Sequence, residues 1–169
     1  MAALAPAPSL PRQVPVLVLL AAAAALSVAF LAQYAGGLIP CQLCVWQRYP
    51  YGVAIGLAAI ALVLIDRPTA ARAVLVLAGL ALLTSAGIAA FHVGVEQHWW
   101  EGLAACTGQV DLNMSAEDLK KQLLETPPVR CDAVPWSLFG VSIAGYNFLF
   151  AGPSGLATLW AALRRRQRP

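Results

Sequence analysis

Four long apolar segments constrain this chain more than any other feature of its sequence. They cover residues 14–34, 49–65, 73–95 and 138–163. The 21 residues of the first segment contain no charge, and as a helix they would be about 31 Å long, enough to cross a bilayer. Charged residues make up only 11% of the 169 residues, against about 25% in soluble domains. The sequence predicts one domain, 1–169, an all-α membrane protein with a four-transmembrane-helix bundle.

Local features refine these segments. Residues 49–65 are near the short limit for a span, but Trp46, Tyr49 and Tyr51 are suited to the membrane interface. The fourth segment contains Gly152-Pro153-Ser154-Gly155, which predicts a kink or a break in the helix. The first segment could alternatively be a secretory signal peptide after Arg12, but its length and the three segments that follow favour a span.

The distribution of charge predicts the orientation. With four spans and cytoplasmic termini, seven basic residues and one acid, Asp66, lie inside, while four basic residues and seven acids lie in the outer loops 36–48 and 96–137. This satisfies the positive-inside rule. The inner basic residues are Arg12, Arg67, Arg72, Arg164, Arg165, Arg166 and Arg168. The C-terminal arginines therefore indicate the cytoplasmic side of a membrane rather than a nucleic-acid partner.

All four cysteines, Cys41, Cys44, Cys106 and Cys131, then lie in the two outer loops. The bacterial periplasm permits disulfides, whereas the cytosol disfavours them. The large outer loop also predicts a short amphipathic helix over 116–125, because Ser115 and Asp118 resemble a capping box and Leu119 and Leu123 share a face.

The sequence Cys41-Gln42-Leu43-Cys44 precedes the second apolar segment. At the start of a helix, free amides and the helix dipole stabilise a thiolate. Arg48 lies one turn beyond Cys44 on the same side, where its charge would lower the pKa of a thiol and could hold an acceptor oxygen. A structural disulfide is the main alternative for the motif, and a snorkelling interfacial arginine is the alternative for Arg48.

Other cysteine chemistries fit less well. A c-type haem site needs His directly after the second cysteine, where this chain has Val45. A four-cysteine zinc site would favour a second closely spaced pair, but Cys106 and Cys131 are 25 residues apart. These two cysteines could form a structural disulfide within their loop, which would stabilise the folded state by about 3 kcal/mol through loop closure. They could equally form a second exchangeable pair that relays electrons by thiol–disulfide exchange.

The sequence closely resembles the DsbB family of disulfide bond formation proteins. The resemblance rests on Pro40-Cys41-x-Leu43-Cys44-x-x-x-Arg48, the four apolar segments and the loop cysteines, and on Asp132, Trp136, Gly140 and Tyr146-Asn147-Phe148 after Cys131. It covers nearly the whole chain from about Gln13.

The resemblance implies a protein-dithiol:quinone oxidoreductase in the bacterial inner membrane. A reduced DsbA-like thioredoxin-fold oxidase would attack the Cys106–Cys131 disulfide, at Cys106. Electrons would pass to Cys41 and Cys44 through a Cys41–Cys131 intermediate. Cys44 would face ubiquinone or menaquinone as a thiolate, and Arg48 would hold the quinone carbonyl oxygen. No metal is required.

Relatives in this family often carry a polar or histidine residue near the outer end of the third helix that helps the quinone site. The stretch Glu96-Gln97-His98 makes His98 a candidate quinone-binding residue, with an exposed interfacial histidine as the alternative. Glu96 could instead cap the helix.

Three rival functions remain open. A vitamin K epoxide reductase-like enzyme also uses four cysteines and a quinone, but its Cys-x-x-Cys is expected in a late helix. The second rival is a non-catalytic membrane scaffold with two structural disulfides. In that case, Cys44→Ala should cause little loss of quinone-dependent thiol oxidation. A small zinc-stabilised membrane protein would contain metal after purification.

Overall fold

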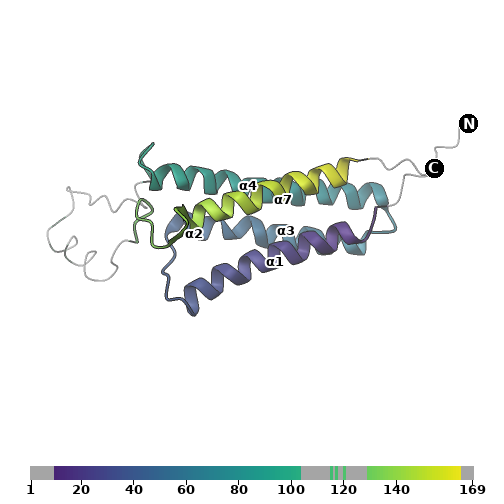
Figure 1. Ribbon diagram of the computed structural model, residues 1–169. Coiled ribbons are helices and arrows are strands. Elements are labelled where there is room, and N and C mark those ends of the chain that lie inside the picture. The colour runs from purple at the N-terminus through teal and green to yellow at the C-terminus, as the bar shows by residue number, and fades with distance from the viewer. Residues whose placement is uncertain (1–9, 104–114, 116, 118–119, 121–128, 165–169) are drawn as a thin grey trace, which may run out of the picture.

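The computed structural model describes residues 10–103, 115, 117, 120 and 129–164. Four long helices, α1 (Gln13–Tyr34), α3 (Arg48–Val63), α4 (Pro68–Glu96) and α7 (Ile143–Leu163), form an elongated bundle. The short helix α2 (Gln42–Trp46) lies at one end, and α1 begins and α7 ends at the other (Figure 1). The chain is thus mostly helical, as predicted. By length and hydropathy, α1 and α4 qualify as candidates to cross a membrane among the described residues.

The helices follow the apolar segments, but some boundaries differ from those expected. Helix α4 starts at Pro68 rather than at residue 73, because proline is well suited to the first helical turn, where its missing N–H costs nothing. Helix α3 starts at Arg48 and has 16 residues. Of the amphipathic helix expected over 116–125, the structure describes only Glu117 and Lys120, both helical.

The start of the fourth apolar segment is not helical, which corrects the expected span 138–163. Two short antiparallel strands, β1 (Ser137–Leu138) and β2 (Val141–Ser142), form a hairpin that pairs Ser137 with Ser142 and Leu138 with Val141. Its two turn residues, Phe139 and Gly140, both have positive φ, as a type I′ turn requires. Helix α7 begins only after Ser142, whose Oγ accepts a hydrogen bond from the Gly145 N–H and caps the helix.

Small residues allow the helices to pack closely. Helix α4 packs against both α3 and α7, and α1 packs mainly on α3. A Cβ atom added to Gly155 would lie 2.8 Å from the Leu83 side chain and 3.0 Å from the Gly79 carbonyl oxygen, so the backbones of α4 and α7 cross in close contact there.

This crossing is also where the expected break would fall. Helix α7 continues unbroken through Pro153, so a break is excluded. The neighbouring α4 holds the helix together, as packed helices do for prolines in membrane bundles.

The outer surface of the bundle is apolar. Large side chains on α1, including Leu17, Val28 and Leu31, are more than half exposed, and Val63 on α3 and Leu163 on α7 are similarly exposed. In contrast, most of the buried hydrophobic residues in the helices are alanines. A water-soluble bundle would bury its large apolar residues, so this arrangement is typical of helices that face lipid.

Candidate functional site

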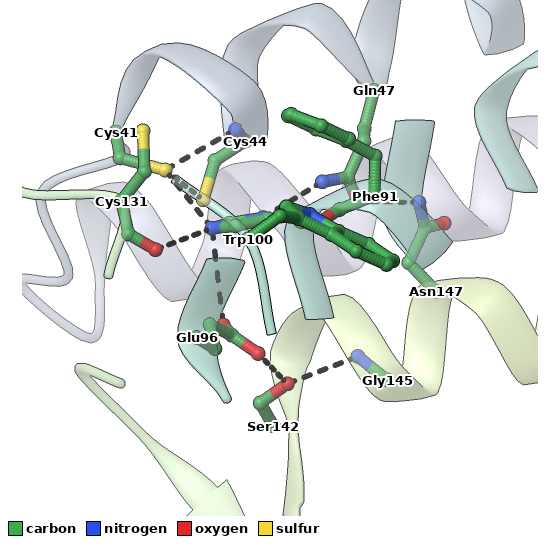
Figure 2. Close-up of polar contacts among 11 residues, drawn as sticks. Cys41, Cys44, Gln47, Phe91, Glu96, Trp100, Cys131, Ser142, Gly145 and Asn147 are labelled. Atoms are coloured by element: carbon green, nitrogen blue, oxygen red, sulfur yellow. Dashed lines mark hydrogen bonds and ion pairs between the residues drawn. The ribbon is translucent and has the colours of Figure 1, made fainter. Parts of the chain in front are cut away.

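Cys41 and Cys44 lie together at the α2 end of the bundle. Cys41 is the N-cap of α2, and its Sγ accepts a hydrogen bond from the Cys44 N–H at 3.3 Å. The two Sγ atoms are 2.9 Å apart, with the Cys41 thiol donating to Cys44 (Figure 2). Both are thiols in this structure. The motif therefore starts a short helix of its own, just before α3.

The two thiols have opposite electrostatic characters. The hydrogen bond from the Cys41 thiol is the main cause that lowers the pKa of Cys44. A hydrogen bond to the Cys41 backbone lowers this pKa further, while burial opposes the shift. The bond to Cys44 and then burial raise the pKa of Cys41 to about 12. Cys44 is therefore the thiol of the pair that is held as a thiolate, and Cys41 supplies the proton that stabilises it.

Cys131 reaches this pair from the segment that precedes the hairpin. It is fully buried and belongs to one apolar cluster with Cys41, Leu43 and Val95. Figure 2 shows Cys131 beside Cys41 and Cys44. The structure thus brings together three of the four expected cysteines, while Cys106 lies outside the described residues.

His92 lies at the centre of the site. It projects from α4 and is only 2% exposed. Its Nε2 atom lies 3.5 Å from the Cys41 Sγ and 3.2 Å from the Cys131 carbonyl oxygen. Sequence reasoning did not select His92, and the available signal was a histidine inside an otherwise apolar helical segment, one turn before Glu96.

A chain of side-chain amides, the buried Gln47 and the half-buried Asn147, sets the tautomer of His92 in this structure. The Tyr51 hydroxyl donates to Asn147 Oδ1, and Asn147 Nδ2 donates to Gln47 Oε1 at 2.6 Å. Gln47 Nε2 is then left to donate to His92 Nδ1 at 2.9 Å. Since Nδ1 accepts, the proton of the neutral imidazole lies on Nε2, facing Cys41 and the Cys131 carbonyl. Ser85 extends this network by donating to the Gln47 carbonyl oxygen.

Glu96 completes the polar cluster from the last residue of α4. Its buried carboxylate accepts a hydrogen bond from Ser142 Oγ, the residue that caps α7 (Figure 2). The other carboxylate oxygen lies 3.8 Å from His92 Nε2. Glu96 therefore connects the start of α7 to His92, a role beyond the helix cap considered from the sequence.

An apolar groove of about 780 Å³ opens beside Cys44. Side chains of α1 and α7 form most of its wall, and Cys44, Gln47 and Arg48 lie at one end together with Tyr51 and Asn147. Arg48 donates a hydrogen bond to Gln33 of α1, and its guanidinium lies 5.2 Å from the centre of the Phe30 ring. The predicted placement of Cys44 and Arg48 on one side is therefore present, at the polar end of a site suited to an elongated apolar molecule.

His98 lies elsewhere. It follows α4 in a left-handed conformation with φ 56° and lines a separate cavity with Trp99, Trp100 and Asp132. The Trp100 indole packs over Gly94 and donates to the Phe91 carbonyl oxygen. The structure does not bring His98 to the groove beside Cys44, and its proposed contact with quinone stays a prediction.

Comparisons with known proteins agree on one family. The family model described as disulfide bond formation protein DsbB matches residues 11–162. The chain is 34% identical over 159 residues to disulfide bond formation protein B of Verminephrobacter eiseniae, covering 88% of this chain and 84% of that protein.

Two further relatives share a lower identity with this chain. The protein of the same name from Azoarcus is 29% identical, over 86% of this chain and 89% of the relative. An uncharacterized protein of Rickettsia prowazekii is 28% identical, over 74% and 72%. No solved structure gives a significant match.

Proposed function

Since the chain belongs to the DsbB family of disulfide bond formation proteins, we propose that it is a protein-dithiol:quinone oxidoreductase of the bacterial inner membrane. It would reoxidise a periplasmic DsbA-like thioredoxin-fold oxidase and pass the electrons through two cysteine pairs to ubiquinone or menaquinone. The observation that carries this proposal is the position of Cys44, a thiolate-favouring residue at the polar end of an apolar groove, with Cys41 and Cys131 directly behind it.

The charges and the arrangement of the bundle support the proposed topology. The start of α1 and the end of α7 lie at the same end of the bundle, opposite α2 and its two cysteines (Figure 1). Four spans with both termini in the cytoplasm would place the cysteines in the periplasm. The exposed apolar side chains of α1, α3 and α7 support contact with lipid.

The proposed reaction proceeds by two disulfide exchanges. A partner thiolate attacks Cys106 of the Cys106–Cys131 disulfide, and the partner leaves as a disulfide while Cys106 and Cys131 become thiols. The Cys131 thiolate then attacks Cys41 of the Cys41–Cys44 disulfide, so that a Cys41–Cys131 bond forms and Cys44 leaves as a thiolate. Cys106 next attacks Cys131, which re-forms the Cys106–Cys131 disulfide and releases Cys41. The burial of Cys131 beside Cys41 supports this exchange because the two residues already share one apolar cluster.

The electrons then pass from the reduced Cys41–Cys44 pair to a quinone in the groove. A bound quinone supplies a two-electron acceptor that takes up two protons. Cys44 presents its thiolate to the groove, and Arg48 offers a fixed positive charge for a carbonyl oxygen. Cys41 keeps its proton while it stabilises Cys44, and it must lose that proton to re-form the disulfide. His92, in contact with Cys41, orients the thiol for that step.

Purified protein in detergent tests the proposal. Quinone-dependent oxidation of a reduced DsbA-like protein is measured for the wild type, Cys44→Ala and Cys106→Ala, with Thr84→Ala as the control because Thr84 is exposed on α4 and bonds only to the Leu80 carbonyl in this structure. Turnover by wild type and control, lost in both cysteine variants, is expected. Absence of turnover with several quinones and partners would favour the scaffold, and turnover in Cys106→Ala would remove the two-pair relay.

A further inference from the structure

Three metal-ligating atoms converge in the site. Cys41 Sγ, Cys44 Sγ and His92 Nε2 all lie within 4.8 Å of one another. The two cysteines come from the start of α2, and the histidine comes from α4, 51 residues beyond Cys41. The sequence pattern directed attention to a four-cysteine site, whereas the fold brings two cysteines together with a histidine.

The distances suit a tetrahedral ion of the zinc class. Zinc binds thiolates at about 2.3 Å and imidazole nitrogen at about 2.0–2.1 Å, which places sulfur and nitrogen about 3.5 Å apart and two sulfurs about 3.8 Å apart on one tetrahedral ion. Cys41 Sγ and His92 Nε2 are already 3.5 Å apart. The sulfurs are 2.9 Å apart, so they must separate by about 1 Å. Cys44 has room to move because it borders the groove.

The surrounding hydrogen bonds can accept a metal-bound histidine. Binding through Nε2 requires the ring proton on Nδ1, which then needs an acceptor. The Gln47 amide nitrogen, Nε2, now faces His92 Nδ1. A 180° turn of the Gln47 amide group places its oxygen there instead, as an acceptor for the Nδ1 proton. Asn147 can turn in the same way because Tyr51 has a hydroxyl that donates or accepts, although Asn147 then gives up the hydrogen bond that it donates to Ser85 Oγ. Such partners orient metal-bound histidines in known sites.

Glu96 supplies a fourth donor or a nearby negative charge. Its Oε1 lies 3.8 Å from His92 Nε2, and Ser142 holds the other oxygen. The fourth position is then available to this carboxylate or to water. With water in the fourth position, two thiolates and a neutral imidazole balance the charge of a divalent ion, as burial favours.

We propose that the reduced Cys41–Cys44 pair and His92 bind a thiophilic divalent cation of the Zn²⁺ class, and that this binding reversibly inhibits the enzyme. Cys41 loses its proton, the Cys44 thiolate has none to lose, and the two sulfurs form two metal–sulfur bonds. Nε2 forms the third bond, and no electrons are transferred. The Cys41–Cys44 disulfide has no thiolate to offer, so the metal competes with oxidation of the pair. The inhibitory part rests on the proposed oxidase function, whereas the binding part does not.

Cd²⁺ is the probe for binding, because thiolate coordination gives an ultraviolet charge-transfer absorption. The full chain in detergent carries Cys106→Ser and Cys131→Ser, so that the loop pair contributes no sulfur. Anaerobic, reduced protein is expected to bind one Cd²⁺ and, above the lowered pKa of Cys44, to release one proton, that of Cys41. Oxidised protein is expected to bind none. His92→Gln should weaken binding by at least tenfold, while His98→Gln should bind like the parent.

X-ray absorption spectroscopy of the unmutated, reduced chain loaded with Zn²⁺ identifies the metal ligands. It needs no variant, so the result does not depend on whether a variant folds. Two sulfurs and at least one nitrogen are expected at the distances given above. A sulfur-only shell, unchanged binding in His92→Gln, or no stoichiometric binding to the reduced pair would overturn the proposal.

Turnover separates the two hypotheses. With chelator present, the wild type is expected to oxidise a reduced DsbA-like partner, and Zn²⁺ should stop it until chelator is restored. If metal binds as expected but chelated protein shows no turnover, the oxidase function fails and the binding site stands. If chelated protein turns over and Zn²⁺ has no effect, the inhibitory part is wrong.

Discussion

His92 Nε2 lies 3.5 Å from the Sγ atom of Cys41, although the two residues are 51 positions apart in the chain. This contact joins the cysteine motif to α4. It also places a titratable ring against the thiol that stabilises the Cys44 thiolate. The consequences for reactivity and stability can be measured separately.

The first prediction concerns the pH dependence of Cys44. Its pKa is lowered from 9.0, chiefly by the Cys41 hydrogen bond, so its thiolate persists below pH 9 and is lost only as pH falls through the lowered value. Removing the donor in Cys41→Ala should return the pKa toward 9.0. Alkylation of Cys44 near pH 7 should then slow about tenfold for each unit regained.

Iodoacetamide trapping with mass spectrometry measures this, in a background that lacks Cys106 and Cys131. Thr84→Ala in the same background is the control. Superimposable pH profiles for Cys44 with and without Cys41 would contradict the hydrogen-bond explanation.

The second prediction concerns Gln47. Replacement by Leu removes the acceptor for the half-buried Asn147 and the donor for the buried His92, and both groups lose these bonds. A buried polar group left unpaired costs about 1–3 kcal/mol. Gln47→Leu should therefore lower the Tm clearly and slow thiol oxidation.

Gln47→Glu is the matched comparison, since its carboxylate keeps the shape and one acceptor. It should retain more of the Asn147 contact than Leu does. Thermal unfolding in detergent and initial rates measure the two effects, and a Leu variant as stable and active as wild type would show that the network is dispensable.

The third prediction concerns the crossing of α4 and α7. A Cβ at Gly155 would contact the Leu83 side chain at 2.8 Å and the Gly79 carbonyl oxygen at 3.0 Å. Gly155→Val should force the helices apart and destabilise the protein by about 1–3 kcal/mol, as overpacking does elsewhere.

Gly87 lies on α4 with nothing within 4 Å of an added Cβ. Gly87→Ala should be neutral or stabilise the protein by up to about 1 kcal/mol, because alanine favours helices. Equal loss of Tm in Gly155→Val and Gly87→Ala would show that helix crossing is not the cause.

The fourth prediction concerns Arg48 and the quinone. Hydrogen bonds to charged groups contribute about 1.5–3 kcal/mol, so Arg48→Leu should raise the KM for quinone roughly 10- to 100-fold. The KM for the reduced protein partner should change little, because Arg48 borders the groove on the α1 side. Steady-state kinetics with each substrate varied in turn makes the comparison.

Arg48→Lys keeps the charge but not the planar guanidinium over Phe30, and should have an intermediate KM. If the KM for quinone is unchanged in Arg48→Leu, the role of Arg48 is structural, through its hydrogen bond to Gln33 of α1.

The fifth prediction concerns Ser142, which joins the start of α7 to Glu96. Ser142→Ala removes both the helix cap and the donor to a buried carboxylate. The cap alone is worth about 1 kcal/mol, so a loss of about 1–3 kcal/mol is expected. Ser154→Ala serves as the control within α7. The Thr158 hydroxyl bonds to the backbone carbonyl oxygen of Ser154, and alanine keeps that oxygen. Chemical denaturation of both variants measures the difference.

The sequence by itself determined the helices and the location of the chemistry. Uninterrupted apolar segments require helices in lipid because every backbone group must find a partner. Cys41 and Cys44 are three residues apart, so local backbone geometry alone brings them together. The hairpin at 137–142 was missed, since an apolar run before a helix looks like part of it and the turn depends on positive φ at Phe139 and Gly140.

Only the tertiary structure decided which polar residues join the cysteines. Gln47 meets Asn147 across 100 residues and His92 across 45, and Glu96 meets Ser142 across 46. In the sequence, these residues lie in or beside apolar segments, and nothing local shows which of them will meet. Burial then requires each to find a partner, and close packing of α3, α4 and α7 determines which partner is in reach.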